Sequence, residues 1–211
     1  MINKDLLRYI ELNIIPRYNK NDKAHNENHV RCVIRNSMLI AENYDVNKNI
    51  IYTAAAYHDL GLEVERERHE IFSKEIMLND KKLDEFFNKE EKEVIADAIL
   101  AHRASSKLEP TSIYGKIIAD ADRDLVPVHI IERTILYSLD KFPQYDKKDH
   151  FIRSREHIKS KYGKESYMKL WLDLKVNNER LEKLRNLISD ESRFKRVFDY
   201  YFEKNTKQYD L

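Results

Sequence analysis

The sequence is poor in the residues that make tight turns and cross-links. Its 211 residues include three glycines, four prolines and one cysteine. So few glycines and prolines leave little material for hairpin turns, which argues against a protein of many β-strands. The single cysteine, Cys32, excludes an internal disulfide and a zinc site built from several cysteines, and it fits a reducing compartment.

An excess of charge of one sign is also lacking. The 38 Lys+Arg and 37 Asp+Glu residues give a net charge of +1, so no general attraction to nucleic acid or membranes is expected. The balance is uneven, because residues 1–140 hold 20 basic and 25 acidic side chains, whereas residues 141–211 hold 18 and 12. The basic segment could meet an anionic partner such as nucleic acid, but a lysine-dotted helical surface is the simpler explanation. The acidic segment favours small substrates over long nucleic acid.

Long apolar runs are absent too. No run approaches the roughly 18 residues that would suggest a membrane span. The first residues lead into a charged amphipathic stretch, whereas a secretory signal would continue into an apolar segment. We therefore expect a cytoplasmic protein that makes no use of a membrane.

What the sequence does contain is apolar residues at helical spacing along most of its length. Residues 4–18, 50–57 and 113–122 each show this pattern, and another helix is expected to start near His29. Residues 88–91, Asn-Lys-Glu-Glu, have the form of a capping box that opens a further helix. Since no segment has the alternation of a strand, we predict an all-α fold.

Histidines and aspartates fall at or near the ends of these predicted helices, from which separate helices can aim side chains at one point. The set comprises His29, His58, Asp59, His69, His102 and Asp122. Imidazole nitrogens mixed with carboxylate oxygens suit a divalent transition metal. Taken singly, each histidine is more simply explained as a hydrogen-bonded core residue. Burying so many titratable groups together is costly unless something such as a metal satisfies them.

The order of these residues resembles the HD family of metal-dependent phosphohydrolases, named for a His…His-Asp…Asp signature. Three blocks carry the resemblance: residues 22–30 with a histidine at the end, residues 55–61 around a His-Asp pair, and residues 117–123 ending in Ala-Asp-Arg. The match spans roughly residues 20–125. It implies an HD-type helical bundle in which His29, His58, Asp59 and Asp122 bind a metal ion.

Two histidines go beyond the minimal signature. By resemblance to HD subgroups with extra histidines, His69 and His102 would bind a second metal ion, with Asp59 bridging the two. The alternative is that both lie behind the ligands or contact a phosphate. His25 matches a family histidine that supports the site without binding metal.

Phosphate recognition needs cations, and three lie near the signature residues. Arg103 follows His102, Arg123 follows Asp122, and Lys116 lies six residues before Asp122. A guanidinium matches phosphate oxygens best, so the two arginines rank first. A structural ion pair with a neighbouring aspartate is an equal alternative for Arg123.

The catalytic residues expected from this pattern are Asp59, through the metal, and Glu63, as a general base or water-positioning group. Other glutamates of the loop at 63–68 compete with Glu63, and a solvated charged loop would explain all of them.

Together these features predict a metal-dependent phosphohydrolase that uses metal-activated water on a small phosphate ester or anhydride, with a nucleotide as the favoured substrate. One or two divalent ions are expected, with Mn, Fe, Co or Ni favoured over Mg. The alternative is a non-catalytic HD module that binds metal or nucleotide. We expect residues 1–140 to form the HD core and residues 141–211 a C-terminal helical extension packed on it, which could cover the pocket or support a homodimer.

Overall fold

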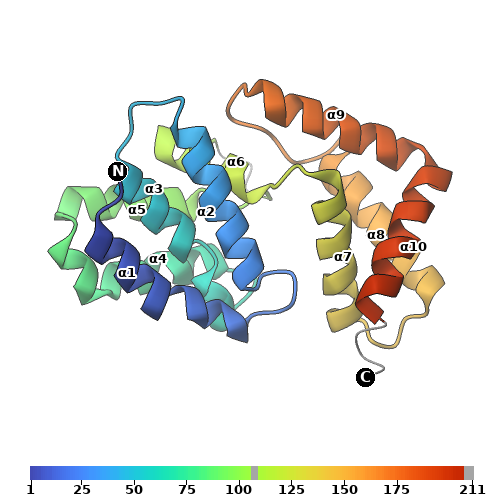
Figure 1. The fold of residues 1–211 in the computed structure, drawn as a ribbon, viewed down its shortest axis with the longest axis horizontal. Coiled ribbons are helices and arrows are strands. Elements are labelled where there is room, and N and C mark those ends of the chain that lie inside the picture. Colours follow the sequence, from blue (N-terminus) through green and yellow to red (C-terminus); the bar gives the residue numbers. More distant parts are fainter. Residues whose placement is uncertain (106–108, 207–211) are drawn as a thin grey trace. The chain divides into compact units, whose positions relative to one another are not determined.

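The structure is a computed structural model that describes residues 1–105 and 109–206 (Figure 1). These residues form helices joined by turns and contain no strand, so the predicted all-α fold is confirmed. No helix in the described ranges is long and apolar enough to cross a lipid bilayer.

The chain divides into two compact units. Unit 1 comprises Met1–Asn21, His25–Asp124 and Leu170–Leu172. Unit 2 comprises Asp22–Ala24, Leu125–Lys169 and the described residues from Asp173 on. All six candidate metal ligands belong to unit 1.

Unit 1 is built around a short buried helix, α3. Its other α-helices pack around α3 or extend that packing; they are α1 (Lys4–Asn13), α2 (Glu27–Ala41), α4 (His69–Asn79), α5 (Lys89–Leu100) and α6 (Ile113–Asp122). Helix α3 (Lys48–Tyr57) is buried from Ile50 to its end and contacts α2, α5 and α6. The three successive alanines of α3, at 54–56, keep its surface flat enough for neighbours to approach closely.

Asparagine side chains start several of these helices. Asn26 accepts hydrogen bonds from the backbone N–H groups of Asn28 and His29, and thereby fixes the first turn of α2. At the start of α5, Asn88 and Glu91 form the capping box that the sequence predicts. Since His29 lies in the capped turn of α2, its position follows directly from local sequence.

The last residue of α3 is held by an aspartate shared between two tyrosines. The hydroxyls of Tyr57 and Tyr9 donate to Asp80 Oδ2 at 2.5 and 2.7 Å. Burial, with the neighbouring Asp80 carboxylate, raises the pKa of Tyr9 to about 12. Asp80 also caps the 3₁₀ helix η3 (Lys81–Glu85). Asp80 thus connects α1, α3 and η3 by hydrogen bonds.

Gly61 allows the turn after α3 to approach α4. It lies in the 3₁₀ helix η2 (Leu60–Glu63), and its N–H donates to Ser73 Oγ at 2.8 Å. A Cβ atom at Gly61 would lie 2.0 Å from the carbonyl oxygen of His69 and 2.6 Å from the backbone nitrogen of Ser73. The absence of a side chain therefore brings the backbone of His69 close to the residues that follow Asp59.

Unit 2 has an apolar core of its own. It contains α7 (Pro127–Lys141), α8 (Lys147–Tyr162), α9 (Lys175–Ser189) and α10 (Glu191–Thr206). Phe151 of α8 packs its ring against Phe194 and Phe198 of α10, with ring centroids 5.8 and 5.3 Å apart. Helix α7 packs on the other three helices of this unit. The domain boundary expected at residue 140 stays a prediction.

Gly61→Ala should destabilise unit 1, because the added methyl group meets backbone atoms that cannot rotate away. We expect the free energy of unfolding to fall by about 1–3 kcal/mol or more, measured by urea denaturation. Gly115→Ala is the matched control, since its Cβ would meet side chains, the nearest at 3.0 Å, within α6. Equal stability of the two variants would contradict the close approach.

Candidate metal centre

The six predicted ligands come from five elements of unit 1 and lie at their ends. His29 is in the first turn of α2, and His58 and Asp59 follow α3 directly. His69 begins α4, His102 follows α5, and Asp122 ends α6. Helix ends are where side chains from several helices can meet without displacing the packed interior.

Asp59 lies at the middle of the cluster, and its Oδ2 atom faces two of the histidines. His58 Nε2 lies 3.3 Å and His29 Nε2 lies 3.5 Å from this oxygen. Asp122 joins the same side, with its Oδ1 atom 3.2 Å from His29 Nε2 and 3.9 Å from His58 Nε2. These four side chains are the ones that the minimal His…His-Asp…Asp signature names.

The Oδ1 atom of Asp59 faces the other two histidines. His69 Nε2 lies 3.3 Å and His102 Nε2 lies 3.4 Å from it. The two Nε2 atoms are themselves 3.1 Å apart. The carboxylate of Asp59 therefore stands between two groups of nitrogen atoms, as a bridging ligand would.

Three of the imidazoles are oriented by their own backbone. The Nδ1 atoms of His58, His69 and His102 lie 2.7, 2.8 and 2.5 Å from carbonyl oxygens three residues earlier in the chain. Because a carbonyl only accepts, each Nδ1 carries the proton and donates it. In a neutral imidazole this leaves the Nε2 lone pair directed at the cluster, as metal binding requires.

The donor set fits a metal. Metal–nitrogen and metal–oxygen bonds of about 2.0–2.2 Å place neighbouring ligand atoms of a tetrahedral or octahedral site roughly 3.0–3.5 Å apart. Most of the contacts above lie in that range. His58 Nε2 is fully buried without a hydrogen bond of good geometry. The facing Nε2 atoms of His69 and His102 need a proton or a cation between them, because two lone pairs at 3.1 Å repel.

The charges of the cluster set its protonation in the metal-free protein. Burial by itself disfavours the imidazolium form of His58, but the carboxylates of Asp59 and then Asp122 outweigh burial and raise the pKa of His58 to about 9. For Asp59 the effect of burial is outweighed by the surrounding histidines, which hold its pKa well below the ordinary value. Burial lowers the pKa of His69, which is therefore neutral at pH 7.

The cluster is buried except along one edge. The side chains of His58 and His102 are 0% and 2% exposed, whereas those of Asp122 and His69 are 14% and 13% exposed. Solvent therefore reaches the site past Asp122 and His69, each of which lies on a different half of the cluster.

Asp120, two residues before Asp122, has a structural role. Its carboxylate accepts hydrogen bonds from the backbone N–H groups of Trp171 and Leu172, at 2.9–3.0 Å. Arg123 Nη1 lies 3.3 Å from Asp120 Oδ1, and both side chains are almost completely buried. Arg123, expected to bind phosphate, is thus in the ion pair that the sequence left open as an alternative. These contacts anchor the short segment Leu170–Leu172 to the end of α6.

The other predicted polar residues are also in ion pairs. Lys116 lies 2.6 Å from Glu109, and Glu63 receives both Nε and Nη2 of Arg17 at 3.1 and 3.2 Å. These contacts supply a structural role for both side chains and leave their predicted functional roles as predictions.

Arg103 lies next to the cluster and is partly exposed. Its Nη1 atom is 3.1 Å from both carboxylate oxygens of Glu70 and also donates to the carbonyl of Glu67. Glu70 Oε2 is in turn 3.6 Å from His69 Nδ1. Arg103 thus lies beside His69, on the half of the cluster that contains His69 and His102.

Sequence reasoning missed Arg66 and Tyr18, and gave His25 only a supporting role. Arg66 Nη2 lies 3.3 Å from His25 Nδ1, and its backbone carbonyl accepts the Nδ1–H of His69. The His25 ring meets that of His29 edge-on at 5.6 Å. Arg66 and Tyr18 have no distinguishing sequence signal, because one lies in a run of charges and the other on an apolar face.

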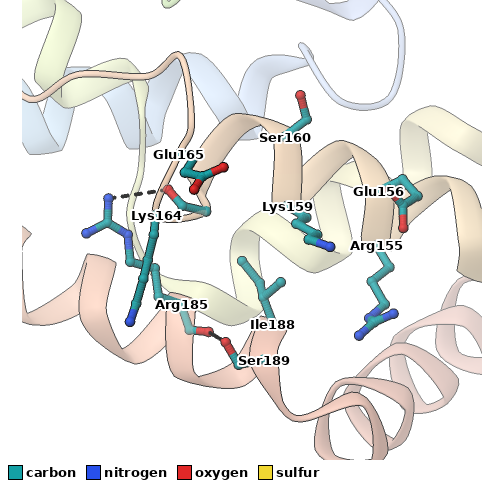
Figure 2. A pocket seen from close by; sticks show the side chains of 10 residues that line it. Arg155, Glu156, Lys159, Ser160, Lys164, Glu165, Arg185, Ile188 and Ser189 are labelled. Carbon is teal, nitrogen blue, oxygen red and sulfur yellow. Dashed lines mark hydrogen bonds between the residues drawn. The ribbon is translucent and has the colours of Figure 1, made fainter.

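A cavity of about 620 Å³ in unit 2 is separate from this cluster (Figure 2). It is lined by residues of α8, of the segment after it and of α9, and contains none of the predicted ligands. Arg155 and Arg185 of its lining pair with Glu191 and Glu182 outside it, at 3.0 and 2.9 Å. The remaining charged side chains of the lining balance one another; they are Glu156, Lys159, Lys164 and Glu165.

Known proteins share both the signature and the fold. Residues 26–125 match the family model described as HD domain. A Clostridium beijerinckii protein described as "Uncharacterized protein" is 41% identical over an alignment of 88 residues, and the match covers 37% of this chain and 53% of the relative. The chain thus spans about half the length of the curated relative it matches.

A solved structure extends the fold comparison. The crystal structure of a Lactobacillus plantarum protein, determined as a structural genomics target, superimposes with a TM-score of 0.65 and 19% identity. The match covers 95% of this chain and 100% of the other. At that identity the likeness concerns the fold alone.

The matched segment contains all six members of the His/Asp cluster, and its helices end where the cluster lies. Residues 26–125 are therefore similar to an HD domain, in line with the resemblance of the sequence signature. HD domains are typically metal-dependent hydrolases, and the matched segment has a buried His/Asp cluster that could hold a metal ion.

Metal binding should release protons at pH 7. His58, with a pKa raised to about 9, is protonated in the metal-free protein and must become neutral to bind metal. His69 and Asp59, whose pKa values are lowered, already have the forms that bind. Metal affinity should therefore rise with pH up to about 9, by roughly tenfold per pH unit for one proton. Titration calorimetry with Mn²⁺ in buffers of different ionisation enthalpy measures this release, and identical heats in all buffers would contradict it.

Proposed function

We propose that this protein is a metal-dependent phosphohydrolase acting on a small phosphate ester or anhydride, with a nucleotide as its substrate class. The observation that carries the proposal is the convergence of four imidazole Nε2 atoms on the two oxygens of one buried carboxylate, Asp59. The match of residues 26–125 to the HD domain supports the same chemistry.

In this proposal Asp59 would contribute to the binding of two metal ions. His29, His58 and Asp122 complete the first set of ligands, and His69 and His102 complete the second. Nitrogen and oxygen donors together favour Mn, Fe, Co or Ni over Mg. Bound divalent ions lower the pKa of water toward neutrality and offset the negative charge of a phosphoryl group.

The protein's own cations orient the substrate. Arg103 lies beside His69 through its contact with Glu70, and the Arg66 guanidinium contacts His25, whose ring meets that of His29. We assign phosphate oxygens to the two guanidinium groups, which match them by charge and planar geometry. Both contacts between Arg103 and Glu70 are made by the single atom Nη1 of Arg103. Arg103 would exchange part of this ion pair for the phosphate when a substrate binds.

The opening at Asp122 and His69 suits a small substrate. Residues 1–140 are net acidic, so a long polyanion gains little from their overall charge. A mono- or triphosphate needs one phosphate at the cluster and leaves the rest of the molecule outside it. We therefore propose nucleotides over nucleic acids as substrates.

Activity should depend on metal and on the cluster. The full chain is stripped with a chelator, reloaded with Mn²⁺, and tested against nucleoside mono- and triphosphates and simple phosphate esters, with phosphate and pyrophosphate products resolved. Asp59→Ala and His58→Ala should lower turnover by more than about 100-fold, because loss of a ligand costs more than loss of a residue behind one. His157→Ala, which removes an exposed imidazole in α8, is the control and should retain turnover.

The outcomes separate the alternatives. Wild-type protein that binds Mn²⁺ and nucleotide yet hydrolyses none of the panel would support the non-catalytic HD module. Full turnover by Asp59→Ala would exclude the cluster as the reaction centre.

The number of ions is tested by His102→Ala. This variant removes a ligand from the second set only, so bound Mn²⁺ should fall from about two ions per chain to about one. Elemental analysis after gel filtration measures the ratio, with His157→Ala again as the control. An unchanged ratio with weaker turnover would favour a role for His102 behind the ligands.

A further inference from the structure

Tyr18 lies completely buried beside the His/Asp cluster, although it is not one of the signature residues. It belongs to the 3₁₀ helix η1 (Ile15–Lys20), whose neighbour in space is η2, the turn that follows Asp59. Its ring lies near that of His58, with centroids 6.4 Å apart. Its hydroxyl group therefore lies at the end of α3, where the His-Asp pair begins.

The hydroxyl group makes two hydrogen bonds there. It donates to the carbonyl of Ala56 at 2.9 Å and accepts from the backbone N–H of Asp59 at 3.3 Å. The last carbonyls of one helix and the N–H groups at the start of the next have no partner within their own helix. Here Ala55 O accepts from His58 Nδ1, and Tyr18 serves both Ala56 O and Asp59 N–H. One phenol thus fixes the backbone on both sides of His58.

The helix η1 is itself held in place from outside. Arg17, next to Tyr18, donates from Nε and Nη2 to the two carboxylate oxygens of Glu63 in η2. These contacts hold Tyr18 in place between α3 and η2.

We propose that Tyr18 is a positioning residue of the metal centre, which sets the backbone of Asp59 so that its carboxylate faces both groups of imidazoles. The inference rests on the metal site in the proposed function but not on hydrolysis. Residues that orient metal ligands typically change metal affinity by 10–100-fold when they are removed. Tyr18 contacts the main chain of the ligand Asp59 and not its carboxylate. We expect its removal to change metal affinity over the same range.

The test is Tyr18→Phe in the full chain, which keeps the ring and removes the hydroxyl. Mn²⁺ affinity should fall about 10–100-fold. The visible spectrum of the Co²⁺-loaded protein should also shift, because the ligand geometry changes. Tyr57→Phe is the matched control, because it also removes a buried tyrosine hydroxyl close to the His-Asp pair in sequence. That hydroxyl donates to Asp80, which is not a member of the cluster. Tyr57→Phe should leave affinity and spectrum unchanged, whatever its effect on thermal stability.

The results distinguish the two proposals. Wild-type affinity and an unchanged Co²⁺ spectrum in Tyr18→Phe would overturn the positioning role, as would equal losses of affinity in Tyr18→Phe and Tyr57→Phe, which would indicate general loosening. Metal binding by the wild type with the predicted difference between the variants, but without turnover, would support the role of Tyr18 and reject the hydrolase.

Discussion

The carboxylate of Asp59 is the group on which the rest of the site depends. Four imidazole Nε2 atoms lie 3.3–3.5 Å from its oxygens, two on each side, in a largely buried cluster. A buried charge of this kind is unfavourable unless opposite charge compensates it. In the metal-free protein a protonated His58 supplies part of that charge, and a divalent ion would supply more. Protons and metal ions thus compete for the same few atoms.

The surrounding fold orients the histidines around that carboxylate through main-chain contacts. Gly61 lets the turn after Asp59 approach the backbone at His69, and the three Nδ1–H donors are bound to carbonyls three residues earlier. Two of these carbonyls, at Ala55 and Ile99, belong to the last turns of α3 and α5, where carbonyls lack partners within the helix. Burying helix ends is costly because these groups are unsatisfied. Here they orient imidazoles, so the same hydrogen bonds stabilise the fold and preorganise the site.

The charged residues near the cluster show how readily neighbours in sequence can mislead. Asp122 is a predicted ligand, whereas the carboxylate of Asp120, two residues earlier, accepts hydrogen bonds from the backbone N–H groups of Trp171 and Leu172, about fifty residues later. Arg123 pairs with Asp120 in the interior, whereas Arg103 and Arg66 lie beside the cluster. Side chains two residues apart on a helix point to different faces, and the groups that each side chain contacts decide its role.

The sequence by itself determined the all-α fold, the helix ends at His29, His58 and Asp122, and the order of blocks that marks an HD domain. These follow from local patterns: apolar periodicity, asparagine caps and the His-Asp signature. The tertiary structure alone decided which charges are in ion pairs, that Arg66 borders the cluster, and that Tyr18 bonds to Asp59. Those outcomes depend on contacts between segments up to fifty residues apart. No local spacing specifies such contacts, because they arise only when helices pack.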